Sequence, residues 1–371
     1  MSSTLGSVRR VPLRSAALVA VVFFYFLIFA QFGFLHLLDR LESPGLVKGG
    51  MAMMAAGGIL GSVMAARGGS LNQLSLRLRV GFLGSAAVAV ASAWMEGLAL
   101  LFLAGALGLC VGTLTVSLVG FLGQTVPRAH VGSVCGWGTG LAYAACNIPP
   151  LFLASAEDHA VMAGLAGLIG CGLAWTDGSA QSIPAIGEDA GSAGRGWIGL
   201  IVVTFTALVW LDSAAFRVIQ SDSLIRDSHW ADPAHIWLIG LSHLAGAVFA
   251  GWWIDRRGFT LPLLGGYSLL AIGYWVMLGH FGGALGGGLY AVGVSLYSAP
   301  LVAVALKQGQ AATASGRAAW LFAVAGWLGS GMGIGMADDL GRVPWWIWGT
   351  FGAVLLLSLS GLASTYRRTA V

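Results

Sequence analysis

Two ionisable side chains stand alone in long apolar stretches of the chain. Asp212 lies in "TALVWLDSAAFRVIQ" (206–220), and His243 lies in "WLIGLSHLAGAV" (237–248). An ionisable group in such surroundings is costly to keep charged, so it can take up and release a proton as its access to water changes. The sequence therefore predicts proton exchange, with Asp212 as the first candidate and His243 as the second. The alternative for His243 is a hydrogen-bonded role in helix packing.

Further polar side chains in apolar stretches are candidates for contact with a solute, namely Tyr25, Gln31, Asn147, Arg217 and Tyr297. Arg217 can bind an anionic substrate, or it can extend its guanidinium toward the water interface. It follows Asp212 by five residues. An ion pair between the two, or capping of a helix end by Asp212, is therefore the alternative to proton exchange.

Sulfur-containing side chains give a weaker indication of chemistry. Met332 and Met336 in "GMGIGMA" are four residues apart, a spacing that places two thioethers on one helix face, and thioethers suit Cu(I). Helix packing is the preferred explanation for this pair. The four Cys occur singly without a CxxC pair, which argues against a disulfide framework or a zinc site.

The composition indicates that lipid surrounds the elements carrying these residues. The chain of 371 residues is 57% hydrophobic and 9% charged, with a mean hydropathy of +0.83. A water-soluble protein of this length needs far more charge on its surface. The Lys and Arg residues are scattered rather than gathered in a basic run, so no nucleic-acid partner is predicted.

Hydropathy predicts an all-α membrane protein with twelve transmembrane helices of about 20 residues each. The run after the basic start "MSSTLGSVRRVPLR" is too long for a signal-peptide core, so it is predicted to remain as the first span. The predicted spans are 15–38, 44–66, 78–96, 98–124, 131–153, 158–175, 197–219, 233–254, 261–279, 282–306, 315–336 and 344–365.

A polar segment divides the twelve spans into two sets of six. Residues 176–195, "TDGSAQSIPAIGEDAGSAGR", are rich in Gly, Ser and Ala and predict a cytoplasmic linker. The predicted units are a six-helix bundle over 1–175 and a second over 196–371. With the N-terminus in the cytoplasm, fourteen of the nineteen Lys and Arg fall on the cytoplasmic side, as the positive-inside rule requires. Both termini are therefore predicted to be cytoplasmic.

Two short stretches repeat at a separation of 190 residues. "GSVMAARG" (61–68) and "GWWIDRRG" (251–258) each end the second span of their half. Gly61 aligns with Gly251, Arg67 with Arg257 and Gly68 with Gly258, whereas Ala65 takes the place of Asp255. Two copies in register, half a chain apart, predict pseudo-symmetric halves.

This pattern resembles the major facilitator superfamily of transporters. The signature of that family between spans 2 and 3 is G-x-x-x-D-R/K-x-G-R/K-R/K, with a weaker copy between spans 8 and 9. Gly251, Asp255, Arg256 and Gly258 match the second copy, and the first copy has decayed. The resemblance covers the whole chain through its span number, linker and topology. It implies that spans 1, 4, 7 and 10 line a central cavity, which would bring Tyr25, Gln31, Asp212 and Tyr297 toward substrate.

The resemblance also implies a role for Asp255. In the family this carboxylate sits near the positive N-terminal end of a helix from the opposite half, a contact that forms when the cytoplasmic side is closed. By pseudo-symmetry Asp255 is expected to face the start of span 5, near Gly132. Arg256 and Arg257 are expected to add contacts across the halves or to headgroups. The alternative is that all three charges only anchor the loop at the headgroups.

We therefore expect a secondary active transporter of a small organic solute, coupled to protons, that works by alternating access as a monomer. It is expected to be no enzyme, to need no cofactor and to lie in a bacterial cytoplasmic (inner) membrane. Drug export is less favoured, because span 4 has no basic residue and span 5 ends in "CNIPPLF". One alternative is copper import, known from one branch of the family. Another is a non-transporting assembly factor for a membrane complex.

Overall fold

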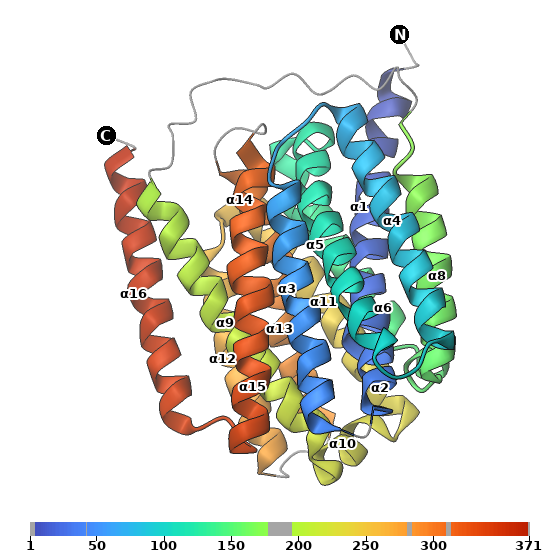
Figure 1. Ribbon diagram of the computed structural model, residues 1–371. Coiled ribbons are helices and arrows are strands. Elements are labelled where there is room, and N and C mark those ends of the chain that lie inside the picture. Colours follow the sequence, from blue (N-terminus) through green and yellow to red (C-terminus); the bar gives the residue numbers. More distant parts are fainter. Residues whose placement is uncertain (1–3, 42, 177–194, 280–283, 309–312, 370–371) are drawn as a thin grey trace.

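The computed structural model describes residues 4–41, 43–176, 195–279, 284–308 and 313–369. Over these residues the chain forms helices and no strand. The long helices run side by side along one axis, and α1 begins at the end of the bundle where α16 ends (Figure 1). The predicted all-α fold is confirmed.

The first half of the chain forms one continuous helical segment and a series of separate helices. The continuous segment consists of α1 (Thr4–Tyr25), the π-helix η1 (Phe26–Gly33) and α2 (Phe34–Asp39). The others are α3 (Pro44–Ala65), α4 (Leu71–Trp94), α5 (Ala99–Thr125), the 3₁₀ turn η2 (Arg128–His130), α6 (Val131–Cys146), α7 (Pro149–Phe152) and α8 (Ala156–Leu173).

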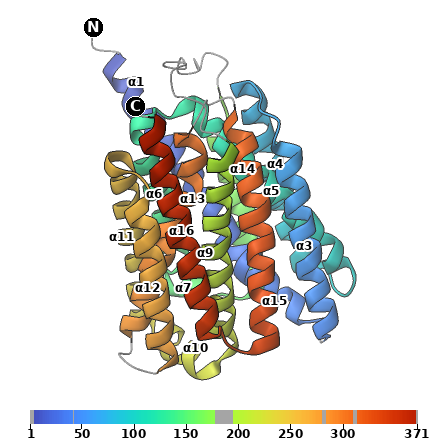
Figure 2. The ribbon, with the colours of Figure 1, turned by 90° about the vertical axis from the view of Figure 1, so that its left-hand side faces the viewer.

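The second half follows a similar order, with one extra short helix. It consists of α9 (Arg195–Ser221), α10 (Ser223–Trp230), α11 (Pro233–Arg257), α12 (Thr260–Leu278), α13 (Ala284–Lys307), α14 (Ala314–Leu321), the π-helix η4 (Phe322–Gly329), α15 (Ser330–Leu340) and α16 (Trp345–Thr369). The extra helix, α10, lies at the end of the bundle opposite the start of α1 (Figure 2).

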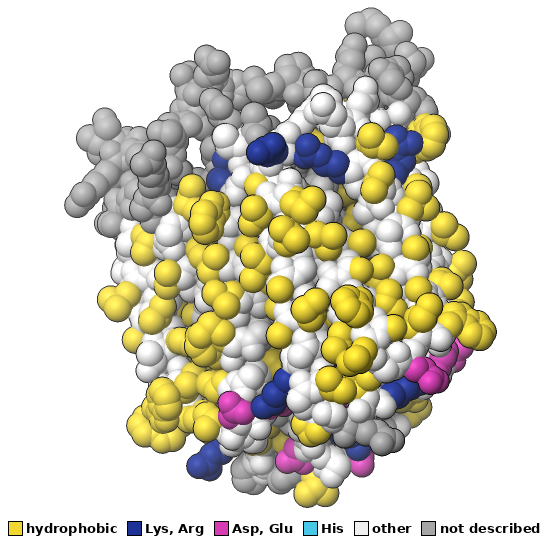
Figure 3. Space-filling model, viewed as in Figure 1, with side chains coloured by type: hydrophobic (Ala, Val, Ile, Leu, Met, Phe, Trp, Pro, Cys, Tyr) yellow, Lys and Arg dark blue, Asp and Glu magenta, His cyan; other side chains and the backbone are white. Residues whose placement is uncertain are grey.

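Within the described ranges, nine helical segments are long and apolar enough to cross a membrane. The other three predicted spans correspond to α6, α8 and α16, which run alongside these nine. An apolar band covers the middle of the molecule, and charged side chains lie above and below it (Figure 3). On the face shown, Asp and Glu gather only at the lower end, whereas Lys and Arg occur at both.

Two predicted span boundaries were wrong for local reasons. The third span begins at Leu71 rather than at 78, because Ser70 and Gln73 form a capping box that starts α4 earlier. The fifth span ends at Cys146 rather than continuing to 153. Pro149 and Pro150 follow shortly afterwards, and a proline in a helix interior removes a hydrogen bond and clashes with the preceding turn.

Helices of the two predicted halves approach most closely where α6 meets α11. A Cβ atom added to Gly136 would lie 2.5 Å from the carbonyl oxygen of Ala247, and one added to Gly251 would lie 2.3 Å from that of Gly132. Only glycine permits this backbone separation, which is the way small residues join transmembrane helices. The predicted linker, apart from Thr176 and Arg195, lies outside the described residues, and the division into two bundles stays a prediction.

Candidate functional site

Asp212 lies on α9 and receives hydrogen bonds from two tyrosines of α13. The Tyr290 hydroxyl donates to Oδ1 at 2.5 Å, and the Tyr297 hydroxyl donates to Oδ2. Seven residues make roughly two helical turns, so both tyrosines project from one face of α13. Tyr297 is a predicted site residue. Tyr290 is not, although its spacing from Tyr297 was available in the sequence.

Two cavities meet at Asp212. The large cavity has a volume of about 610 Å³ and is walled by α1, η1, α3, α5, α9, α13, η4 and α15. The small chamber has a volume of about 70 Å³ and lies between η1, α6, α9, α10, α11 and α13. Four residues line both spaces: Gln31, Tyr143, Asp212 and Phe216. Asp212 therefore lies where the large cavity, which has room for an organic solute, meets the small chamber, which does not.

The wall of the large cavity carries Arg217, but this residue does not pair with Asp212. Its Nε lies 2.6 Å from Oδ1 of Asp338 on α15. Five residues along an α-helix differ in direction by roughly 140°, which turns Arg217 away from Asp212. The alternative of an Asp212–Arg217 pair is therefore wrong. Capping of a helix end is also wrong, since Asp212 lies inside α9.

His243 and Asn147, both predicted site residues, line the small chamber. Nδ1 of His243 lies 2.8 Å from the Ser295 hydroxyl on α13, and its ring stacks on Tyr143 with centroids 4.2 Å apart. The side-chain amide of Asn147 donates to the Tyr143 carbonyl at 2.8 Å. These contacts fix the chamber wall where α6 meets α11. Tyr143 is a site residue that the sequence did not reveal.

Four aromatic rings close the small chamber at the end of the bundle near α10. Phe32, Phe152, Trp230 and Phe216 all line the chamber and contact one another in that order, with ring centroids 5.4 to 5.7 Å apart. We call these residues the aromatic cluster. Phe32 and Phe152 come from the first predicted half, and Phe216 and Trp230 come from the second. The cluster therefore joins the two predicted halves on this side.

The other two candidates of the first span, Tyr25 and Gln31, have different positions. Gln31 lies on η1 and borders both cavities. Tyr25 is fully buried, and its hydroxyl donates to the Ser85 carbonyl of α4 at 2.8 Å. It lines neither cavity, so the structure separates Tyr25 from the site. Six residues apart, the two side chains leave the helix on different sides.

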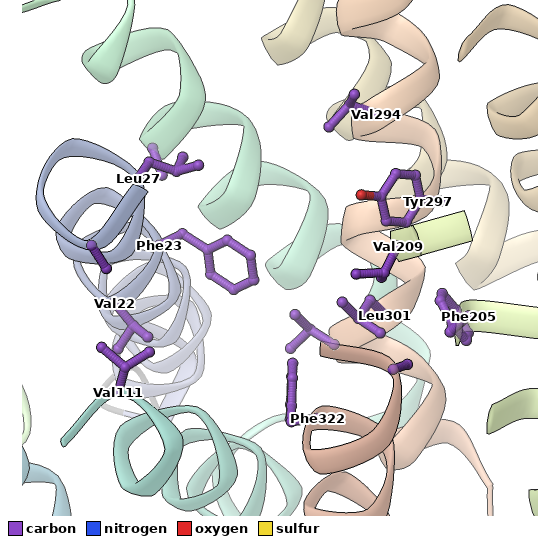
Figure 4. Packing of buried hydrophobic residues seen from close by; sticks show 14 of the residues in the cluster. Val22, Phe23, Leu27, Val111, Phe205, Val209, Val294, Tyr297, Leu301 and Phe322 are labelled. Atoms are coloured by element: carbon purple, nitrogen blue, oxygen red, sulfur yellow. The ribbon is translucent and has the colours of Figure 1, made fainter. Parts of the chain in front are cut away.

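On the side of Asp212 that faces the start of α1, apolar side chains close the large cavity. Phe23 of α1, Leu301 of α13 and Phe322 of η4 point toward one another, with Val111 and Val209 beside them (Figure 4). All five are buried and come from both predicted halves. This apolar layer separates Asp212 from the end of the bundle that carries Asp255.

At that end, Asp255 of α11 receives donors from the start of α6. The Gly132 amide donates to Oδ1 at 2.7 Å, the Ser133 amide donates to Oδ2 at 2.7 Å, and the Ser133 hydroxyl donates to Oδ2 at 2.6 Å. Lys307 of α13 adds an ion pair at 2.8 Å. The predicted contact with the start of span 5 near Gly132 is present. We call these four residues the Asp255 network; the sequence did not reveal Ser133 or Lys307.

The two arginines that follow Asp255 do not join this network. Arg256 lies over the ring of Trp252 at 4.5 Å, and Arg257 lies over that of Trp253 at 5.0 Å. These cation–π contacts direct both charges along their own helix. Gly258 then ends α11 with φ of +85°, a conformation that L-residues with side chains rarely adopt.

The first copy of the repeat has a packing role in the structure. A Cβ atom on Gly61 would lie 2.2 Å from the Leu109 carbonyl, so this glycine lets α3 approach α5. Ala65, in the place of the acid, is buried. Arg67 and Gly68 are exposed in the turn after α3, and the Arg67 carbonyl accepts a hydrogen bond from Arg77. This copy therefore has no counterpart of the Asp255 carboxylate.

Met332 and Met336 do not face one shared site. Met332 lines the large cavity with Met51 and Met54, whereas Met336 packs against the hydrophobic core. Within the described residues, no group of three or more His, Cys, Asp or Glu side chains is arranged to hold a metal ion.

The comparisons with known proteins concern the fold. No family model matches the chain, and no curated protein matches it in sequence. It is similar to the solved structure of the proton:xylose symporter XylE bound to 6-bromo-6-deoxy-D-glucose, with a TM-score of 0.65, 14% identity, and coverage of 95% of this chain and 94% of that one. It is also similar to the human organic anion transporter MFSD10 (TETRAN), with a TM-score of 0.61, 15% identity and coverage of 95% and 98%. Both span nearly the whole chain, which therefore has the fold of the major facilitator superfamily.

Proposed function

We propose that the protein is a secondary active transporter that moves a small organic solute by alternating access and couples this movement to protons through Asp212. The observation that carries the proposal is the position of Asp212 at the junction of two cavities, inside the helical bundle. No Lys or Arg of the described residues forms an ion pair with it.

The energetics of the site support proton coupling. A carboxylate in the middle of a membrane protein costs roughly 2.5–3.5 kcal/mol on insertion scales, so it needs compensation. The two tyrosine hydroxyls stabilise the ionised form by hydrogen bonding. Water in the adjoining cavities can take up the proton. A carboxyl group under these opposing influences, burial against its charge and hydrogen bonds in favour of it, takes up or releases a proton when its access to the two sides of the membrane changes.

The two ends of the bundle support alternating access. At one end the Asp255 network and the apolar layer join the predicted halves, and we place this end in the cytoplasm because Lys and Arg prevail there. Movement of solute to that side requires these contacts to break. The hydrogen bonds and the ion pair of the Asp255 network are local, and the apolar layer consists of a few side chains. These contacts can therefore break and form again as the predicted halves tilt.

The lining of the large cavity bears on the solute. Its two basic residues, Lys48 and Arg217, both pair with carboxylates, at 3.2 Å to Asp339 and 2.6 Å to Asp338. Asp212 is the remaining acid of the lining. An anion would therefore meet an excess of negative charge, and a neutral or cationic solute is favoured.

The test begins with a ligand-stabilisation screen of the purified protein, including xylose as a neutral probe and benzoate as an anionic probe. A stabilising solute is then followed in proteoliposomes with an imposed proton gradient. We expect gradient-driven accumulation by the natural protein, and exchange without accumulation by Asp212→Asn. Full accumulation by the Asp212→Asn variant would contradict proton coupling at this site.

Two other functions are outcomes of the same experiments. Met51, Met54 and Met332 line the large cavity, so Cu(I) is an alternative cargo whose uptake would fall in Met332→Leu. An assembly factor would show no flux of any solute and would co-purify stably with a membrane complex.

A further inference from the structure

The small chamber is too small to bind an organic solute. Its volume of about 70 Å³ compares with roughly 300–1,000 Å³ for sites that bind drug-sized ligands. A buried water needs roughly 10–15 Å³ on this measure, so the chamber has room for a few waters. Its polar lining includes Asp212, Tyr290, His243 and Asn147, which supply the partners that buried water requires.

His229 of α10 is the polar residue at the opposite wall of the chamber. It is only 4% exposed. Its Nδ1 lies 2.9 Å from the Ile225 carbonyl, and the Ser228 hydroxyl beside it donates to the same carbonyl at 2.8 Å, so Nδ1 carries the hydrogen and Nε2 is left as an acceptor. Nε2 is buried and has no hydrogen-bond partner among the described residues. A buried acceptor without a donor is rare in folded proteins, and a chamber water is the partner available.

The same imidazole also reaches solvent. Its Nδ1 lies 2.7 Å from the hydroxyl of Ser228, and Ser228 is exposed. One nitrogen of His229 is therefore left for the small chamber, while the other contacts the hydroxyl of an exposed residue. Gly287 of α13 leaves the space for this ring, since a Cβ atom there would lie 3.1 Å from its Cδ2.

We infer that the small chamber holds a water chain through which Asp212 exchanges its proton with solvent by way of His229, while the solute uses only the large cavity. This inference rests on the proposed function and adds a separate route for the proton. The other titratable groups along the route are Tyr143, Cys146, Tyr290, Tyr297 and His243, with His235 beside Ser228 at its solvent end.

The transfer requires only O–H and N–H bonds to form and break. Asp212 gives its proton to a chamber water, and the chain delivers a proton to Nε2 of His229. As this N–H bond forms, the Nδ1–H bond breaks and its proton passes to the Ser228 oxygen, whose own proton leaves its hydrogen bond to the Ile225 carbonyl and passes to solvent. Loading of Asp212 is the reverse transfer. A proton moving back or a rotation of the ring restores the original tautomer.

The test measures proton exchange at Asp212 directly and needs no solute. After a rapid pH jump, time-resolved infrared spectroscopy of the detergent-solubilised protein follows the carboxylic-acid band of Asp212, assigned by its loss in Asp212→Asn. We expect His229→Gln to slow this exchange at least about tenfold, because the amide can hydrogen-bond to the water chain but cannot accept and release protons near neutral pH. His36→Gln, a change of an exposed histidine near the same end of the bundle, should leave it unchanged.

A second variant fills the chamber while keeping the histidine at position 229, whose ring has to shift away from the new side chain. Gly287→Val should also slow the exchange, because its side chain displaces the water chain, whereas Gly172→Val on the open side of α8 should not. Unchanged exchange in both His229→Gln and Gly287→Val would overturn the separate route and leave proton coupling at Asp212 intact. Absence of any Asp212 band that responds to pH would instead contradict the proposed proton coupling itself.

Discussion

The Asp255 carboxylate of α11 accepts a hydrogen bond from the Gly132 amide at the first turn of α6, at 2.7 Å, across 123 residues of sequence. The amide belongs to the N-terminal end of a helix, where unpaired N–H groups and the helix dipole favour a negative charge. Lys307 brings a third helix, α13, to the same carboxylate. One side chain thus joins three helices at the end of the bundle that we place in the cytoplasm.

Replacing Asp255 with Asn should open this end more often. The change removes the ion pair with Lys307 and the charge of the acceptor, and hydrogen bonds to charged groups contribute roughly 1.5–3 kcal/mol. Such a loss shifts a two-state equilibrium by about tenfold or more. Cys135 is buried beside this contact, so its alkylation rate in a variant without the other three cysteines reports the opening. We expect a rate about tenfold higher than with Asp255 present. Asp227→Asn, on the exposed side of α10, is the control, and an equal rate in both proteins would refute the role of Asp255.

Replacing Tyr297 with Phe should lower gradient-driven transport about tenfold, because Oδ2 of Asp212 loses a donor that stabilises its charge. Asp212→Asn is expected to exchange solute without accumulating it, and adding Tyr297→Phe should leave this exchange rate unchanged, since the two residues act on the same proton. Initial rates in proteoliposomes compare gradient-driven accumulation by the natural protein and Tyr297→Phe, and solute exchange by Asp212→Asn with and without Tyr297→Phe. Tyr267→Phe, a tyrosine of α12 that bonds to Trp348, is the control. A further loss of exchange when Tyr297→Phe is added to Asp212→Asn would show that Tyr297 acts independently of Asp212.

Replacing Gly136 with Ala should destabilise the protein, because the new Cβ would lie 2.5 Å from the Ala247 carbonyl where α6 meets α11. Overpacking of this kind costs roughly 1–3 kcal/mol. The same change at Gly172 of α8 has nothing within 4 Å and should be neutral. Thermal unfolding of the two variants in detergent compares them, and equal midpoints would contradict the close approach of α6 and α11.

Replacing Trp230 with Ala should open the small chamber toward the α10 side. Removing this indole breaks the contacts of the aromatic cluster with Phe152 and Phe216. Cys146 lines the chamber and is buried, so a protein retaining only this cysteine should be alkylated about tenfold faster, as for a shift of about 1.4 kcal/mol. Trp94→Ala changes an exposed tryptophan and should have no effect. A Cys146 rate that does not respond to Trp230→Ala would show that the cluster does not close the chamber.

The contact of Asp255 was predictable because the resemblance to the major facilitator superfamily, carried by "GWWIDRRG" and its copy 190 residues away, implied that this acid meets a helix N-terminus of the opposite half. Pseudo-symmetry then indicated which helix end the acid would face. The contacts of Asp212 were not predictable in this way. Its partner tyrosines lie 78 and 85 residues later on another helix, and no repeat aligns them with it.

The spacing of residues along one helix predicts which side chains share a face of that helix. Five residues separate Asp212 from Arg217, which places them on different sides of α9. Seven residues separate Tyr290 from Tyr297, which places them on the same side of α13. The helical spacing therefore argued against a pair between Asp212 and Arg217 and for a shared face of Tyr290 and Tyr297. It did not identify Asp338 as the partner of Arg217.

The sequence by itself determined that lipid surrounds the protein, where the helices lie and where the motif repeats. It could do so because hydrophobicity and helix-capping residues act locally and the membrane imposes a minimum span length. It also placed Asp212 within an apolar helix. Only the tertiary structure decided that Tyr290 and Tyr297 reach this carboxylate, that Tyr25 leaves the site, and that His229 lies between the small chamber and an exposed serine. Those relationships depend on the rotation of each helix about its axis and on its distance from its neighbours. Side chains that are distant in the sequence set both, because they pack together in one interior.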